Sequence, residues 1–151
     1  MSEFPSPALP RRLAALIYDT CLVLPLVMFG TAVAMGVHMG IDGESSTRVD
    51  AQVLDANLVQ VLTLLTTAAF YCGFWLLKGQ TLGMQAWRIR LRSFRGESVT
   101  PRQAVLRCLG AVVSLLPAGA GYWWCLFDRN NRYWHDYLSG TELELLPKRR
   151  D

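Results

Sequence analysis

The stretch PRRLAALIYDTCLVLPLVMFG, residues 10–30, decides how this chain is interpreted. Two arginines precede an apolar run, which is the pattern of a helix entering a membrane from its basic side. Asp19 interrupts that run, roughly 10 Å beyond its start at Leu13 if a helix rises about 1.5 Å per residue. An ionised Asp at mid-membrane costs about 2.5–3.5 kcal/mol, and such residues face a protein interior or a wet cavity. Asp19 is therefore the first candidate site residue.

The composition of the whole chain is typical of a membrane protein. Of its 151 residues, 52% are hydrophobic and only 18% are charged. The apolar residues form blocks at 13–37, 56–77 and 104–127, each long enough to cross a bilayer. We expect an all-α membrane protein, a small helical bundle in a single transmembrane domain over residues 1–151. A basic loop at 78–103 and a C-terminal tail at 128–151 complete it.

The positive charges predict the orientation. Lys and Arg gather before the first block and in the loop at 78–103, whereas the loop at 38–55 is acidic. Cytoplasmic loops carry the excess of Lys and Arg, so we expect the N-terminus and the basic loop in the cytoplasm. The net charge of +3 is then a matter of topology, and we expect no nucleic-acid partner.

The third block leaves two topologies open. A single crossing by residues 104–127 puts a basic C-terminal tail outside the cell, against the charge rule. The block is interrupted by Pro117, Gly119 and Gly121, residues that break helices. Two half-helices meeting there return the tail to the cytoplasm, whereas a kinked single span does not. We favour the broken, returning arrangement on charge alone.

The basic loop contains a short alternating pattern. In WRIRLR, Trp87, Ile89 and Leu91 alternate with Arg88, Arg90 and Arg92, and a period of two predicts a strand. Turning at residues 94–97, it forms with residues 97–100 a possible short cytoplasmic β-hairpin near 87–100. We expect its arginines to face lipid phosphates, unless the segment is only a solvated basic loop.

Three segments resemble one known family. RRLAALIYD (11–19), KGQTLGMQAWRIRL (78–91) and DRNNRYWHDYLSGT (128–141) are similar to the RDD family of bacterial multi-pass membrane proteins, named for one arginine and two aspartates. On this resemblance the arginine is Arg12, with Arg11 as the adjacent candidate, and the aspartates are Asp19 and Asp136. The family is described only as perhaps transporting unidentified ligands. The resemblance implies the bacterial cytoplasmic (inner) membrane as the location.

The partner of Asp19 is predicted from depth. Arg12 is on nearly the same helix face but two turns away, whereas Arg107 lies at a similar depth in the third block. We therefore expect Asp19 and Arg107 to pair between helices, in a polar cluster with Arg12 and Asp136. The alternatives are a buried ion pair that only fixes helix register, and a structural pairing of Asp136 with Arg12 or a loop arginine.

Further polar residues suggest the lining of a pathway. Pro25 removes a backbone bond to Cys21, close to Asp19 and the hydroxyl of Thr20, and oxygen-rich breaks of this kind bind cations. A polar stripe on the second block faces helices or a cavity. It consists of Asn57, Gln60, Thr63, Thr67 and Tyr71.

No sequence pattern of an enzyme is present. The cysteines lie in apolar blocks without CxxC spacing, and the histidines are far apart, so we expect neither a metal site nor a cofactor. There is no P-loop, nucleophile elbow or dinucleotide fingerprint.

Two functions are compatible with these features. The first is a small transporter or ion-coupled permease in which Asp19 binds a proton or small cation; so short a chain needs a homo-oligomer or a partner membrane protein to enclose a path. The second is a non-transporting membrane scaffold or accessory protein whose charged cluster is structural and whose basic loop recruits lipid.

Overall fold

The computed structural model describes residues 5–42, 55–117 and 119–147. The chain forms two compact units. One unit comprises Met1–Asp19 with Tyr71–Asp151, and the other comprises Thr20–Phe70. All candidate charges of the sequence pattern belong to the first unit, which also holds the small sheet.

Two long helices provide the apolar part of the fold. Helix α1 is Leu9–Asp42 and helix α2 is Ala56–Lys78. Leu9–His38 and Ala56–Lys78 are long and apolar enough to cross a membrane. The prediction of two such helices is confirmed.

In the unit Thr20–Phe70, several polar side chains form hydrogen bonds within their own helix or at its end. Asp55 precedes α2 and accepts a hydrogen bond from the backbone N–H of Asn57 at 3.0 Å, as an N-cap does. The hydroxyls of Thr31 and Thr63 donate to carbonyls of their own helices, at 3.0 and 2.8 Å. The apolar side chains of this unit are largely exposed, for example Phe29 at 69% and Leu65 at 62%. Exposure on that scale suits a lipid environment.

The third apolar block is broken at the predicted place. Helix α4, Pro101–Leu115, begins with a capping box between Thr100 and Gln103. Past Pro117 the chain turns at Gly119, whose φ of 77° is left-handed, into α5 (Ala120–Trp123) and the 3-10 helix η3 (Trp124–Leu126). The two arms, Pro101–Leu115 and Ala120–Leu126, are bent by 108°.

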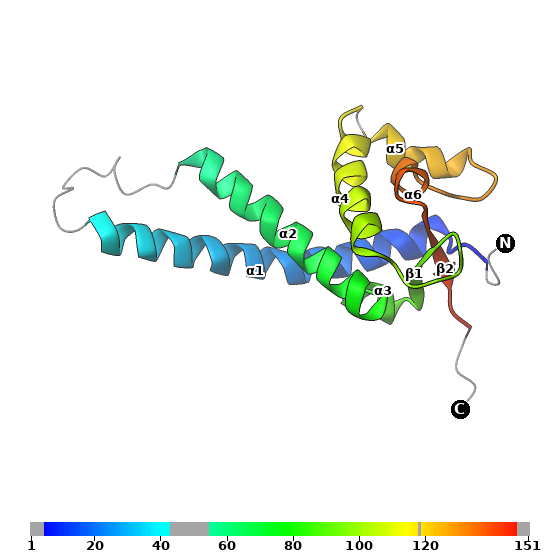
Figure 1. The fold of residues 1–151 in the computed structure, drawn as a ribbon, viewed down its shortest axis with the longest axis horizontal. Helices are drawn as coiled ribbons and strands as arrows, with labels where there is room; N and C mark the ends of the chain where they lie inside the picture. The colour runs from blue at the N-terminus through cyan, green and yellow to red at the C-terminus, as the bar shows by residue number, and fades with distance from the viewer. Residues whose placement is uncertain (1–4, 43–54, 118, 148–151) are drawn as a thin grey trace. The chain divides into compact units, whose positions relative to one another are not determined.

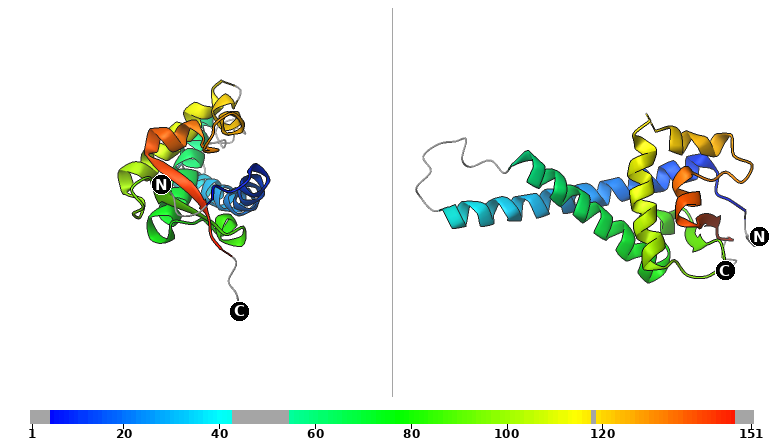
Figure 2. Two further views of the ribbon diagram at one scale, coloured as in Figure 1. Left: turned by 90° about the vertical axis from the view of Figure 1, so that its right-hand side faces the viewer. Right: turned by 45° about the horizontal axis from the view of Figure 1, so that its top comes forward.

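The small sheet corrects the predicted hairpin. Strand β1 is Ile89–Ser93, but its antiparallel partner is β2, Thr141–Leu145, from the C-terminal tail. Ile89 lies opposite Leu145 and Ser93 opposite Thr141. The course of the two strands can be followed by label in Figure 1 and by colour in Figure 2. Residues 97–100, all described, form no strand. The β1 strand was therefore predicted correctly, and its partner wrongly.

The start of β1 differs as well. The short helix α3, Leu82–Ala86, ends at Trp87, and Arg88 follows with a φ of 58°. Trp87 is 41% exposed and lies outside the alternation, whereas Ile89 and Leu91 are 1% and 2% exposed. The period of two therefore holds from Ile89 onward.

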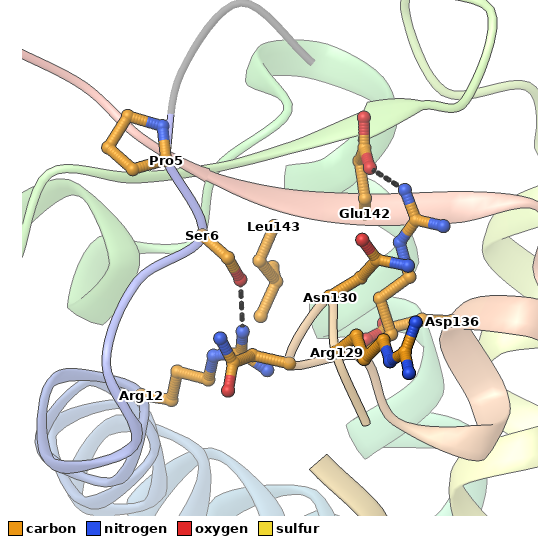
Figure 3. Close-up of a pocket in the computed structure, with 10 residues that line it drawn as sticks. Pro5, Ser6, Arg12, Arg129, Asn130, Asp136, Glu142 and Leu143 are labelled. Carbon is orange, nitrogen blue, oxygen red and sulfur yellow. Dashed lines mark hydrogen bonds and ion pairs between the residues drawn. The ribbon is translucent and has the colours of Figure 1, made fainter. Parts of the chain in front are cut away.

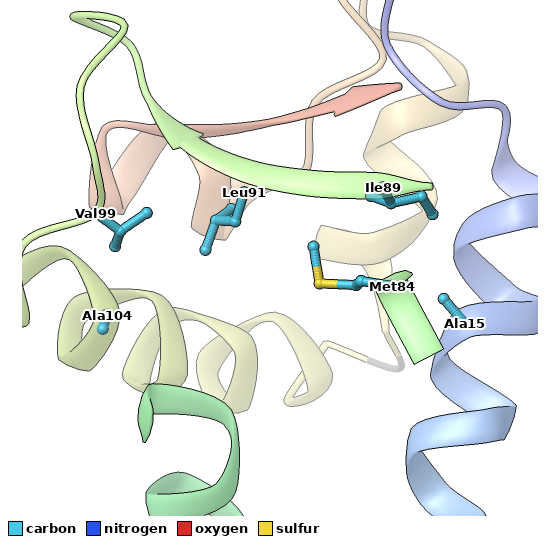
Figure 4. Packing of buried hydrophobic residues seen from close by; sticks show 6 residues of the cluster. All are labelled: Ala15, Met84, Ile89, Leu91, Val99 and Ala104. Atoms are coloured by element: carbon cyan, nitrogen blue, oxygen red, sulfur yellow. The ribbon is translucent and has the colours of Figure 1, made fainter. Parts of the chain in front are cut away.

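The core of this unit lies beneath β1. Ile89 and Leu91 point toward Met84 of α3 and Ala104 of α4, with Ala15 of α1 at one end (Figure 4). Helix α6, Trp134–Ser139, packs on α4, and it ends at Gly140, whose φ of 64° allows the turn into β2. Two further backbone hydrogen bonds extend the layer: Leu145 donates to the carbonyl of Pro5 at 3.0 Å, and Leu146 to that of Arg88 at 2.8 Å. The N-terminal segment, the basic loop and the tail thus form one hydrogen-bonded layer.

Candidate functional site

Asp19 is held by two neutral donors from the segment that starts α3. Its carboxylate accepts hydrogen bonds from the hydroxyl of Thr81 at 2.5 Å and from the backbone N–H of Gly83 at 2.8 Å. Asp19 is 2% exposed and Thr81 is fully buried. Thr81 is also the N-cap of α3, accepting from the N–H of Met84 at 3.2 Å. The carboxylate therefore fastens the start of α3 to α1.

Gly83 makes this close approach possible. A Cβ at that position would lie 2.2 Å from the carbonyl oxygen of Ala15 and 2.9 Å from Cγ of Asp19. No side chain fits there, so the backbone N–H can reach the carboxylate only while residue 83 is glycine. The hydrogen bonds of Asp19 with Thr81 and Gly83 therefore form a close contact between α1 and α3 that requires glycine at position 83.

Arg107 binds the second family aspartate instead of the first. Its guanidinium donates to Asp136 and, at 2.8 Å, to the hydroxyl of Thr141. Arg107 is 4% exposed and Asp136 is 1% exposed. The predicted Asp19–Arg107 pair is therefore wrong, because Arg107 lies on the face of α4 that meets α6 and β2.

Asp136 also caps the start of helix α6. Its second oxygen accepts from the backbone N–H of Tyr133 at 2.7 Å, which caps the helix. On the next turn, Ser139 is 2.7 Å from the hydroxyl of Thr141 and donates to the carbonyl of His135 at 2.6 Å. A closed polar network thus joins α4, α6 and β2.

His135 is buried beside this network in its neutral form. It is 5% exposed, and Nδ1 lies 3.4 Å from the hydroxyl of Ser114. Burial, reinforced by the cation of Arg107, lowers the pKa of His135 to about 3 despite the opposing effect of Asp136. An imidazole in this position stays uncharged near neutral pH.

Arg12 lies at the edge of a pocket, separate from both aspartate contacts (Figure 3). Its Nε donates to the carbonyl of Pro7 at 2.9 Å and one terminal nitrogen donates to Ser6 at 2.6 Å. The guanidinium carbon lies 4.8 Å from the centroid of the Tyr133 ring. Arg12 and Asp136 both line the pocket, but no ion pair joins them. The pocket has a volume of about 370 Å³ and is lined by Pro5, Ser6, Arg12, Arg129, Asn130, Asn131, Arg132, Asp136, Glu142 and Leu143.

The four charges of the predicted polar cluster therefore fall into three contacts rather than one cluster. Asp19 belongs to the α1–α3 contact, Arg107 and Asp136 to the α4–α6–β2 network, and Arg12 to the pocket. All four are buried. The grouping differs from the prediction because each side chain faces a different neighbour in the layer.

The predicted pathway residues are divided between the two units, with Tyr71 in one and the others in Thr20–Phe70. Asn57 and Gln60 are exposed, and Asn57 bonds to Asp55. Thr63 and Thr67 are half-buried, and Thr63 bonds to its own helix. Thr20 is exposed. The ring of Tyr71 lies 5.4 Å from that of Trp75, which belongs to the same unit as Tyr71. A role of this stripe in lining a pathway stays a prediction.

The basic loop is partly tied to the protein. Arg92 forms an ion pair with Glu144 at 3.6 Å and donates to the carbonyl of Gly96, so it has protein partners as well as exposure. Arg90 is exposed and Arg88 is half-buried. Contact of these arginines with lipid stays a prediction.

Several residues of the site escaped the sequence analysis. Thr81, Gly83 and Thr141 carry no charge, and reasoning from charge alone passes over them. A signal existed for Thr81, because a threonine just before a short helical run is an N-cap candidate. A signal also existed for β2, because TELEL alternates directly after a glycine.

The comparisons with known proteins point to one family. The model of the RDD family matches residues 6–140, which is most of the chain. Among curated proteins and among solved structures, none matches.

Proposed function

We propose, from the premise that the chain belongs to the RDD family, that it is a bacterial inner-membrane scaffold or accessory protein whose buried charges are structural. Its apolar helices α1 and α2 anchor it in the bilayer. The layer built from the N-terminal segment, the basic loop and the C-terminal tail presents a fixed polar surface on one side of the membrane.

One observation carries this proposal. Asp19, Arg107 and Asp136 are each 4% exposed or less and each is bonded to partners from another element. A carboxyl group whose two oxygens each accept a hydrogen bond from a fixed donor does not need a mobile cation as a partner. Removing one partner of such a contact leaves an uncompensated buried group, so these residues stabilise the layer.

The backbone hydrogen bonds support a topology for the layer. A β-ladder cannot form through a bilayer, so the β1–β2 pairing favours placing the basic loop and the tail on the same membrane face. The bond from Leu145 to Pro5 adds the N-terminal segment to that face. Because Lys and Arg concentrate in these parts, the face is the cytoplasmic one. In this topology the chain crosses the membrane with α1 and α2. Helices α4 and α5 enter the membrane from the cytoplasmic face and return to it.

Transport is the second candidate, and the break between α4 and α5 favours it. The arms are bent by 108°, and discontinuous helices of this kind line binding sites in transporters. In that case Asp19 binds a proton or small cation, and copies of the chain enclose the path.

Proteoliposomes and thermal unfolding together distinguish the two functions. The wild type is reconstituted with a pH-sensitive dye inside and given sodium or potassium gradients, beside Asp19→Asn. In Asp19→Asn an amide NH₂ group replaces one of the two carboxylate oxygens that accept from Thr81 and Gly83. One hydrogen bond to a charged group is therefore lost, at a cost of about 1.5–3 kcal/mol. At ~2–4 °C per kcal/mol for a chain of this size, the melting temperature falls by about 3–12 °C.

The control is Glu97→Gln, which removes an exposed charge outside these contacts. A scaffold shows no gradient-driven proton movement in either protein and a lower melting temperature for Asp19→Asn only. Proton movement in the wild type that disappears in an equally stable Asp19→Asn protein overturns the scaffold and establishes the transporter.

A further inference from the structure

Among the residues that the structure describes, the buried guanidinium of Arg12 has no anionic partner. Arg12 is 7% exposed, and its two hydrogen bonds go to neutral acceptors, Pro7 and Ser6. The remaining terminal nitrogen, Nη1, is buried and has no hydrogen-bond acceptor. Among the residues that the structure describes, no carboxylate lies within ion-pairing distance of Arg12. A buried cation normally has a counter-charge, so its absence among residues 5–42, 55–117 and 119–147 favours one supplied by a bound ligand.

The aromatic contact of Arg12 does not replace that counter-charge. The Tyr133 ring lies 4.8 Å from the guanidinium carbon and covers one face of the group. Such a contact is worth about 0.5–2 kcal/mol, but a ring face accepts no directed hydrogen bond in the guanidinium plane. Tyr133 therefore holds Arg12 in place without supplying a counter-charge, and Nη1 is the nitrogen that stays without an acceptor.

The pocket in front of Arg12 is positively charged on balance. Three of its lining charges are compensated by ion pairs: Arg132 pairs with Glu142 at 2.5 Å, and Asp136 pairs with Arg107, which does not line the pocket. Arg129 also lines the pocket and has no described carboxylate within ion-pairing distance. The described residues therefore leave two guanidinium charges, on Arg12 and Arg129, uncompensated around one space (Figure 3).

The acid that precedes Arg129 in the sequence, Asp128, already has hydrogen-bond partners. Asp128 accepts from the backbone N–H groups of Asn130 and Arg132 at 3.2 and 2.9 Å, and from the hydroxyl of Tyr137 at 2.8 Å. These bonds hold the turn that carries Arg129 beside the pocket. Asp128 itself does not line it.

We propose that this pocket binds a phosphate group, held by Arg12 and Arg129. Arginine forks match phosphate oxygens in bidentate geometry, and two uncompensated cations match a doubly charged anion. Ser6 and the amides of Asn130 and Asn131 offer neutral donors beside them. A volume of about 370 Å³ accommodates a phosphate together with part of the molecule that bears it.

The phosphate has two possible sources. Arg12 lies in the first turns of a helix long and apolar enough to cross a membrane, a depth at which lipid headgroups are within reach. A free phosphate or soluble phosphate ester has the same chemistry. The experiment uses inorganic phosphate in one arm and phosphatidic acid in the other.

Binding is measured on the full chain purified in detergent. Inorganic phosphate is titrated against chloride at matched ionic strength and followed by thermal stabilisation; phosphatidic acid is titrated against diacylglycerol and followed by native mass spectrometry. The variants are Arg12→Gln and Arg129→Gln. Arg102→Gln is the matched control, because it removes the same charge from an exposed position that does not line the pocket.

Saturable binding of either probe is expected in the wild type and in Arg102→Gln. Loss of one charged hydrogen-bonding group weakens it about 10-fold or more in each pocket variant. Arg129→Gln decides the outcome if Arg12→Gln does not fold, because Arg129 is exposed at the pocket rim. Binding of inorganic phosphate alone identifies a soluble ligand, and binding of phosphatidic acid identifies a headgroup. No saturable binding in either arm, or equal weakening by Arg102→Gln, overturns the proposal.

Discussion

Asp136→Asn is expected to be among the most damaging single substitutions in the polar layer. The change keeps the shape of the side chain and removes its charge. Arg107, 4% exposed, then keeps a buried positive charge without its counter-ion. The amide oxygen also cannot serve both Arg107 and the N–H of Tyr133, which the two carboxylate oxygens now do. Breaking a buried pair by removing one partner costs about 3–5 kcal/mol.

This loss of stability is large enough to be measured as a fall in the melting temperature. At ~2–4 °C per kcal/mol for a chain of this size, 3–5 kcal/mol corresponds to a fall of about 6–20 °C. Tryptophan fluorescence of the detergent-purified chain follows the transition, because Trp75 and Trp134 lie next to the network. Glu97→Gln, an exposed change, should leave the transition within about 2 °C.

A double-mutant cycle separates the pair from general damage. Arg107→Gln alone should cost a similar amount, and the double variant should cost much less than the sum, because neither charge is then left unpaired. Additive losses, or a fall of less than about 3 °C for Asp136→Asn, would refute the reasoning that this pair holds α4, α6 and β2 together.

Three other outcomes follow from single contacts. Gly83→Ala puts a Cβ 2.2 Å from a backbone carbonyl and should cost about 2–4 kcal/mol in thermal unfolding, whereas Gly73→Ala, with nothing within 4 Å of its Cβ, should be tolerated; equal losses would contradict the close packing. The sulfurs of Cys72 and Cys108 lie 3.4 Å apart, so mild oxidation with copper phenanthroline should join them within one chain, detected by peptide mass spectrometry and lost with Cys72→Ser; a failure to cross-link argues against this packing of α2 on α4. The pKa of His135 is about 3 in the folded chain against 6.5 unfolded, so the stability it contributes is complete above pH 6.5 and falls toward pH 3. By pH 5 the loss should be about 2 kcal/mol, and His135→Gln should remove this slope; an unchanged slope would show that another group titrates.

Local patterns predicted the elements of this fold well. Long apolar blocks indicated α1 and α2, and an alternation of period two indicated β1 from Ile89 onward. The residues Pro117 and Gly119 marked the interruption between α4 and α5. Each of these signals depends on neighbouring residues only, which is why one sequence was sufficient.

Pairings between distant segments were harder to predict. The hairpin within the basic loop was the nearest available partner for β1, but the actual partner lies in the C-terminal tail, and local alternation carries no record of it. The pairing of Asp19 with Arg107 was inferred from depth and opposite charge. Depth does not give the direction in which a helix face points, and neutral donors such as Thr81 and Gly83 satisfy a carboxylate without any charge to reveal them.

The proposed scaffold depends on the N-terminal segment, the basic loop and the tail sharing one face of the membrane. Cysteine labelling tests this most directly, in a background with the four native cysteines replaced. Glu97→Cys reports on the basic loop and Pro147→Cys on the tail, and each is treated with a membrane-impermeant maleimide in intact cells and in inverted vesicles. We predict that both positions are protected in cells and labelled in inverted vesicles. Labelling of the two positions from opposite sides would contradict the β1–β2 layer and the topology built on it.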